Sequence, residues 1–159
     1  MRVFTKVSPQ VWSSPAFRAL PDDARLLFHY YLSSPHQTSA GCCGLPDGYA
    51  ITDLGWEMDR YRSARTALAD ASMVKVDLDS SEILVMKWFK HNPAMNPSHR
   101  KSIVRAIQQI ASKALQGCAQ QELEAAELEA RQLQQAPALS TPLASAALLR
   151  SRGYGKPGF

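Results

Sequence analysis

The side chains best suited to binding chemistry in this sequence are three arginines within six residues, Arg60, Arg62 and Arg65. A guanidinium group can donate two parallel hydrogen bonds to a guanine base or clasp a phosphate. Two hydroxyl side chains, Ser63 and Thr66, lie among the arginines and suit phosphates or base edges. This set of donors predicts a surface that contacts nucleic acid.

The arginines lie on a segment that we expect to be a helix from about Met58 to about Ala71. Its apolar residues recur at helical spacing, at Tyr61, Ala64, Leu68 and Ala71. With this stripe facing inward, Arg65 lies near the edge of the core and must extend to reach solvent, whereas the other two arginines flank the outward face. Asp59 and Asp70 share that face, so a solvated and charge-balanced helix surface is the alternative interpretation.

The elements that position this helix follow from hydrophobic periodicity and turn residues. In chain order we expect a helix over 21–33, a short strand over 42–45, a short helix over 49–54, a turn at Gly55, the arginine-bearing helix, and a β-hairpin with strands over 73–78 and 83–89. This is the order of a winged helix, in which two helices and a turn brace a reading helix for the major groove. The expected fold class is mainly α with a small β component, a winged helix-turn-helix with extra C-terminal helices.

The remaining segments complete an expected division into four parts. Residues 1–20 form an N-terminal arm, with a helix start at Ser8-Pro9 and apolar anchors at Val11, Trp12, Phe17 and Leu20. Residues 21–116 form the winged-helix domain and a following helix, which begins at Asn96-Pro97 and carries the stripe Ile103, Ile107, Ile110 and Leu115. Residues 117–136 form a C-terminal helix, and residues 137–159, rich in Pro, Ser and Ala, form a flexible tail.

The predicted hairpin has an acidic tip, which a simple winged-helix DNA-binding protein does not need. Asp77, Asp79 and Glu82 lie at or beside the turn, and phosphate would repel them. The hairpin is therefore expected to point away from DNA or toward a protein. Compensating positive charge lies on Arg100, Lys101 and Arg105 of the following helix and on Arg150, Arg152 and Lys156 of the tail.

Composition is that of an ordinary globular protein with a basic balance. The chain has 159 residues, of which 45% are hydrophobic, and a formal net charge of +4. A mildly basic protein suits a polyanionic partner, although this degree of charge is common and does not decide the matter by itself. No apolar stretch reaches the ~20 residues that a membrane helix needs, and none follows the charged N-terminus as in a signal peptide. We therefore expect the cytoplasm of a bacterial host, association with the nucleoid, and no membrane partner.

The residues that often hold metals or perform catalysis are scattered. The three cysteines include the adjacent pair Cys42-Cys43, and their odd number without CxxC spacing indicates reduced thiols. His36 lies near this pair but does not complete a zinc ligand set. The four histidines stand apart from any acid or nucleophile at a motif spacing, and no glycine-rich phosphate loop is present. We expect no metal, no cofactor, no catalytic residues and no enzymatic activity.

Several motifs resemble the N-terminal domain of phage and prophage replication-initiator-like proteins. The stretches that carry this resemblance cover about residues 10–110 and are Val11-Trp12-Ser13-Ser14-Pro15-Ala16-Phe17-Arg18-Ala19-Leu20, Asp23-Ala24-Arg25-Leu26-Leu27, Ser34-Pro35-His36-Gln37-Thr38, Leu45-Pro46-Asp47-Gly48-Tyr49, Asp53-Leu54-Gly55-Trp56 and Trp88-Phe89-Lys90-His91-Asn92-Pro93. The resemblance implies a winged helix that binds double-stranded DNA at an origin or operator, and a C-terminal part that recruits a replication protein. This chain has only a short tail and carries Cys42-Cys43 where an aromatic or basic residue is expected.

Two functional alternatives stay open at this point. The same fold serves transcriptional regulators, and it also serves protein-binding modules, including phage proteins that inhibit a host factor. The acidic hairpin and the glutamate-rich helix after Gly117 suit a replication or host protein as the partner. The helices that begin at Pro97 and Gln120 either pair with a second copy to form a homodimer or fold back on their own domain.

Overall fold

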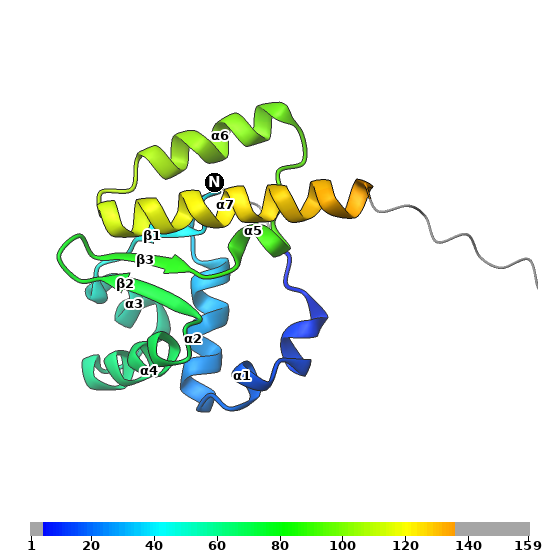
Figure 1. The fold of residues 1–159 in the computed structure, drawn as a ribbon. Helices are drawn as coiled ribbons and strands as arrows, with labels where there is room; N and C mark the ends of the chain where they lie inside the picture. The colour runs from blue at the N-terminus through cyan, green and yellow to red at the C-terminus, as the bar shows by residue number, and fades with distance from the viewer. Residues whose placement is uncertain (1–4, 136–159) are drawn as a thin grey trace, which may run out of the picture.

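The protein is mainly helical, with one small antiparallel sheet. The structure is a computed structural model that describes residues 5–135. In chain order its elements are η1 (Pro9–Ser13), α1 (Pro15–Arg18), α2 (Asp22–Ser33), β1 (Cys42–Gly44), α3 (Asp47–Leu54), α4 (Met58–Asp70), β2 (Val74–Asp77), β3 (Glu82–Val85), α5 (Trp88–His91), α6 (Pro97–Gln108) and α7 (Lys113–Gln135). The predicted tail over 137–159 lies outside the described residues. Figure 1 shows α2, α3 and α4 on one side of the sheet and α6 and α7 on the other.

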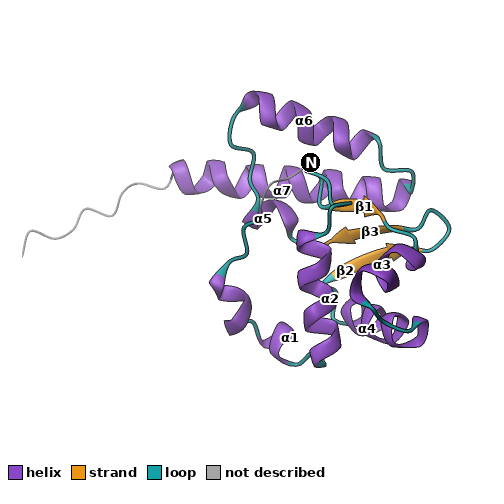
Figure 2. Cartoon of the chain, turned by 180° about the vertical axis from the view of Figure 1, so that it is seen from behind, coloured by secondary structure: helices purple, strands orange, loops and turns teal. Residues whose placement is uncertain are grey.

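The sheet has three strands in the order β1-β3-β2, all antiparallel. β2 and β3 form the predicted hairpin, in which Val74 pairs with Val85 and Asp77 pairs with Glu82. β3 is buried along its whole length because it lies between β1 and β2 and has helices on both faces. The sheet is thus the central layer of the domain, as the view from behind in Figure 2 also shows.

The helices α2, α3 and α4 pack as the sequence predicts. Acidic residues open α2, and Ala24, Leu27, Phe28 and Tyr31 are its buried face. α3 begins at Asp47, two residues before the predicted start. Gly55 ends α3 with a φ of 64°, a left-handed conformation that glycine adopts without strain.

The second strand of the hairpin is shorter than predicted. The sequence predicts a strand over 83–89, but β3 ends at Val85 and the helical turn α5 begins at Trp88. The chain changes direction at Lys87, whose φ is 57°. This reversal buries the rings of Trp88 and Phe89 in the core. Burial of two large aromatic side chains outweighs their preference for extended backbone.

The C-terminal helices also differ from their predicted bounds. α6 begins as expected, with Asn96 accepting a hydrogen bond from the backbone of His99, but it ends at Gln108. Ile110 therefore lies in the connection, and Leu115 belongs to α7. The predicted boundary at Gly117 falls inside α7, which starts at Lys113. Both helices fold back on their own domain, because Ile103, Ile107, Leu115, Ala119 and Leu123 all join the single core.

The N-terminal arm is attached to the core by two of its four predicted anchors. Phe17 and Leu20 are buried, and Val11 packs partly against them. Trp12 is 61% exposed, but its ring covers part of the core because it packs edge-on against Phe17, with ring centres 5.4 Å apart. Ser8 caps η1 by accepting a hydrogen bond from the backbone of Gln10, as the Ser8-Pro9 signal predicts.

The cysteines give the first testable prediction. Cys42 and Cys43 are buried in β1, and burial raises the pKa of each thiol to about 12. At pH 8 a thiol-specific aromatic disulfide reagent should therefore react quickly with one thiol per folded chain, the half-exposed Cys118. The other two thiols should react only after unfolding. Three fast-reacting thiols in the native protein would contradict the burial of Cys42 and Cys43 in β1.

The same pKa shifts set a pH dependence. Because the folded-state pKa is raised, the unfolded chain loses these two protons first as the pH rises above about 9. The free energy of unfolding should therefore decrease between pH 9 and 12, which urea unfolding at a series of pH values measures.

Candidate nucleic-acid interface

Helix α4 is held in place by contacts to both α2 and α3. Its buried face consists of Tyr61, Ala64 and Leu68, three of the four residues of the predicted stripe. The hydroxyl groups of Tyr31 and Tyr61 lie 3.0 Å apart in the core and share a hydrogen bond between α2 and α4. This bond pairs two hydroxyl groups inside the core and, together with the packing of the buried face, sets the rotation of α4 about its own axis.

Arg60 is held by an acidic residue of α2. Its Nε and Nη2 atoms donate hydrogen bonds of 2.8 and 2.6 Å to the two carboxylate oxygens of Asp23. Its guanidinium group also lies 4.4 Å from the ring centre of Trp56. The Arg60 hydrogen bond holds the pKa of Asp23 below its ordinary value. Arg60 therefore joins α2 to α4, and its charge is already matched.

Arg65 and Arg62 share one carboxylate at the start of α3. The Arg65 guanidinium donates to Asp47 Oδ1 and lies over the ring of Tyr61, and the Arg65 side chain is only 12% exposed. Its position at the core edge confirms the prediction from the helical wheel. Arg62 is different, because its Nε lies 3.5 Å from Asp47 Oδ2 and its side chain is 58% exposed. Arg62 is therefore the arginine of α4 with the weakest internal attachment.

The outward face of α4 exposes the predicted polar residues of both kinds. Ser63 and Thr66 are exposed, and so are Asp59 and Asp70. With Arg60 and Arg65 paired, Arg62 is the cation of α4 that remains available to an external anion. The face thus offers one guanidinium group beside two hydroxyl groups, between acidic residues at either end of the helix.

Two further predicted site residues lie elsewhere. Arg100 donates hydrogen bonds of 2.6 and 3.1 Å to the carboxylate of Glu127, so it joins α6 to α7. Lys101 is exposed on α6. Figures 1 and 2 place α6 beyond the sheet from α4. The structure therefore does not bring these two residues to the face that carries Arg62, Ser63 and Thr66.

The acidic residues of the hairpin have structural partners that sequence reasoning missed. Glu82 is buried, and its carboxylate accepts hydrogen bonds from the backbone of Ala111 (2.9 Å) and Ser112 (2.8 Å). Asp77 accepts from the Ser112 hydroxyl, which holds the pKa of Asp77 below its ordinary value. These carboxylates lie at the N-terminal end of α7, where a helix favours negative charge. Asp79 is then the exposed acid of the tip.

The described residues contain neither a candidate metal site nor a helix suited to cross a membrane. No three or more His, Cys, Asp or Glu residues within 5–135 are grouped to hold a metal ion. Among the helices of that same range, none combines the length and apolar character needed to cross a bilayer. Comparison of the chain with family models, curated proteins and solved structures gave no match.

Proposed function

We propose that the chain is a winged-helix module that binds double-stranded DNA selectively, with α4 as its reading helix, and that it acts as a phage or prophage replication-initiator-like protein. Support comes from topology: α2, β1, α3, α4 and the β2–β3 hairpin follow one another in winged-helix order, with the sheet order β1-β3-β2. The short α3 and the glycine turn brace α4 so that its outward face stays exposed.

The observation that carries the proposal is the exposed row Arg62, Ser63 and Thr66 on a helix whose rotation is fixed. One turn of α4 separates Arg62 from Thr66, so these side chains can reach neighbouring bases or phosphates. The ion pairs of Arg60 and Arg65 assign both residues to the support of α4. The proposed contact set is therefore narrower than the sequence alone predicts.

Binding of duplex DNA is tested with the full chain and a labelled random 24-base-pair duplex, followed by fluorescence anisotropy at 50 and 200 mM salt. The expected result is binding that weakens as salt rises, because phosphate contacts release counterions. Selection of bound sequences from a random pool then separates an origin-like repeat or an operator from absence of preference. No anisotropy change at 50 mM salt would overturn the proposal.

Substitution of Arg62 gives the sharper prediction. Arg62→Ala should weaken DNA binding by about tenfold, because a bidentate arginine contact contributes about 1–3 kcal/mol. Stability should change little, since its contact with Asp47 is long and exposed. Arg105→Ala is the matched control, because Arg105 is an exposed arginine on α6, across the sheet. An Arg62→Ala variant that binds DNA as tightly as the wild type would remove α4 from the interface.

A protein-binding module is the second candidate, and one observation favours it. Two of the three arginines of α4 are neutralised by Asp23 and Asp47, and acidic Asp59 and Asp70 remain exposed beside them. A face with balanced charge suits a protein partner better than a polyanion. Failure of DNA binding by a folded wild-type chain would favour this alternative, including inhibition of a host factor, whereas a transcriptional regulator with the same fold would still bind DNA.

A further inference from the structure

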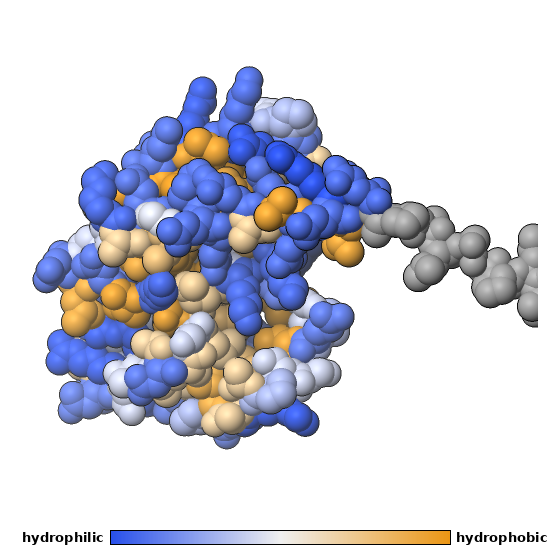
Figure 3. All heavy atoms as spheres, in the orientation of Figure 1, coloured by the Kyte–Doolittle hydropathy of each residue, from blue (hydrophilic) through white to orange (hydrophobic). Residues whose placement is uncertain are grey.

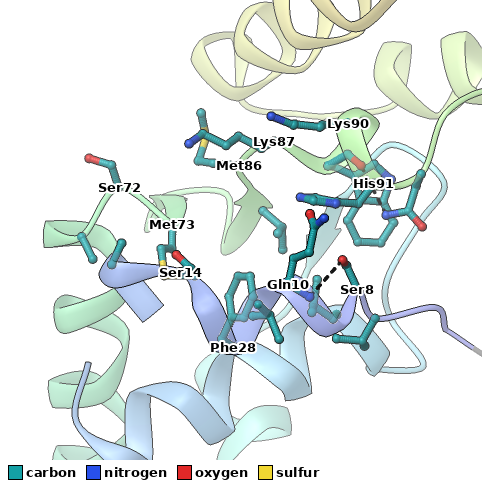
Figure 4. A pocket seen from close by; sticks show the side chains of 18 of the residues that line it. Ser8, Gln10, Ser14, Phe28, Ser72, Met73, Met86, Lys87, Lys90 and His91 are labelled. Carbon is teal, nitrogen blue, oxygen red and sulfur yellow. Dashed lines mark hydrogen bonds between the residues drawn. The ribbon is translucent and has the colours of Figure 1, made fainter. Parts of the chain in front are cut away.

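A groove runs between the N-terminal arm and the chain reversal after β3. Its volume is about 320 Å³. Figure 4 shows Ser8, Gln10 and Ser14 of the arm on one side and Lys87, Lys90 and His91 on the other. The apolar part of its lining, here called the floor, consists of Val11, Phe28, Leu32, Met73, Val85 and Met86. The groove is separate from the outward face of α4 and borders only the C-terminal end of that helix.

Positive charge is concentrated on the rim of this groove, where the carboxylate of Glu122 accepts a hydrogen bond of 2.8 Å from the backbone of Lys87. Lys6, Lys87, Lys90 and His91 line it, and its lining contains no aspartate or glutamate. Within residues 5–135, the ion pairs involve arginines and leave these three lysines without a carboxylate at salt-bridge distance. An occupant with negative charge around an apolar side chain would complement this arrangement.

The shape and floor of the groove favour a peptide over nucleic acid. Single strands bind on exposed aromatic rings, but the aromatic side chains of this groove, Phe28 and Trp88, are buried in the core. A DNA duplex, whose major groove alone is about 12 Å wide, is too large to enter a hollow of about 320 Å³. A hollow of about 320 Å³ fits one or two aliphatic side chains carried by an acidic helix.

Such an acidic helix surface occurs in this same chain, on the second half of α7. Leu123 is the last buried residue of α7, and none of residues 124–135 is buried. Leu128 is 56% exposed on the outward face, with Glu124 one turn before it, Arg131 one turn after it, and Glu129 about 100° further around the helix. Figure 3 shows separate hydrophobic patches on α7 among hydrophilic neighbours. A helical segment of this length gains little stability without packing.

We propose that the chain forms a two-fold homodimer in which the Glu124–Leu128–Glu129 surface of each α7 docks into the groove of the partner copy. Leu128 fills the apolar floor, and the two glutamates pair with the basic rim. A two-fold axis makes both contacts at once, so each copy gives its helix and receives one. The dimer buries the part of α7 that the monomer leaves exposed.

A charge exchange between the two surfaces tests the dimer by sedimentation velocity of the full chain from 1 to 100 μM. The groove variant is Lys6→Glu with Lys90→Glu, and the helix variant is Glu124→Lys with Glu129→Lys. All four side chains are exposed, so both variants should keep the circular dichroism spectrum of the wild type. Each variant alone should be monomeric, because each sets like charges against each other at both contacts.

The mixture of the two variants is the decisive sample. A mixed dimer places a negative groove on a basic helix and a basic groove on a negative helix, so mixing should restore the dimer peak. Lys101→Glu with Lys113→Glu, which makes the same charge change away from the groove, should stay dimeric. A monomeric wild type at 100 μM, variants that dimerise like the wild type, or a mixture that stays monomeric would each overturn the proposal.

Discussion

Gly41→Ala should destabilise the domain by about 3 kcal/mol or more and lower its melting temperature by at least 10 °C. Two independent causes act at this position. Gly41 has a φ of 72°, which an alanine adopts only with strain. A Cβ atom would also lie 2.3 Å from Cγ of the buried Trp88 ring. The ring cannot move away freely, because Trp88 Nε1 donates a hydrogen bond of 3.1 Å to the carbonyl of Ser39.

Gly44→Ala is the control for this substitution. Gly44 lies in the same strand region, but a Cβ atom there would have no heavy atom within 4 Å and its φ is not positive. The free energy of unfolding should change by less than about 0.5 kcal/mol, or increase slightly as the unfolded chain loses freedom. Urea unfolding of both variants measures the difference. Equal stability of the two would mean that Trp88 does not pack on Gly41.

Glu82→Ala should lower the free energy of unfolding by about 2 kcal/mol. The carboxylate of Glu82 accepts hydrogen bonds from the backbone of Ala111 and Ser112 and from the Ser80 hydroxyl. Removal leaves the Ser112 N–H group buried without an acceptor, at a cost of about 1–3 kcal/mol. It also removes a negative charge from the N-terminal end of α7. Denaturant unfolding followed by circular dichroism measures the loss.

Asp79→Ala is the control for Glu82→Ala, because it also removes a negative charge from the hairpin but no hydrogen bond to the start of α7. Asp79 is exposed at the tip, so its replacement should change stability by less than about 0.5 kcal/mol. If the hairpin touched DNA, Asp79→Ala would also raise affinity by removing repulsion, whereas Glu82→Ala would act only through the fold. A Glu82→Ala variant as stable as the wild type would contradict a stabilising role for the Glu82 hydrogen bonds at the start of α7.

The features that the sequence predicted well are those with local causes. The stripe from Tyr61 to Leu68 places α4 at Met58–Asp70, within one residue of expectation. Ser8, Gly55 and Asn96 mark helix ends because a cap or a left-handed turn depends on a few neighbouring residues. The mainly helical fold with a small antiparallel sheet follows from the same periodicities.

The features that it missed depend on residues distant in the chain. Asp23 lies 37 positions before Arg60, and no local pattern marks the two as partners. Trp88 and Phe89 have strand-forming side chains, but packing on the core converts their backbone into a helical turn. Gly117 costs a helix about 1 kcal/mol, and burial of Ala119 and Leu123 beside it outweighs that cost.

The sequence predicted which candidate residues of α4 are exposed, but not which of them are engaged in ion pairs inside the domain. The helical wheel placed Ser63 and Thr66 outside and Arg65 at the core edge, as the structure has them. The wheel could not show that Arg60 pairs with Asp23 and Arg65 with Asp47, since it treats one helix in isolation. It also could not show that the hairpin carboxylates face α7. Charge counted along a sequence therefore overestimates the charge that a surface offers.

The uneven burial of α7 has a consequence for local unfolding. From its second turn to Leu123 the helix belongs to the core, so we expect its amide hydrogens to exchange with solvent only when much of the domain opens. Beyond Leu123 no residue is fully buried, and the packing of Ala126 and the Arg100–Glu127 ion pair are the contacts that hold this part of α7, so the helix can fray from its end back to Glu127 at low cost. One continuous helix thus combines well-protected and poorly protected amides. Slower hydrogen exchange in its last three turns would show that a partner molecule packs against them.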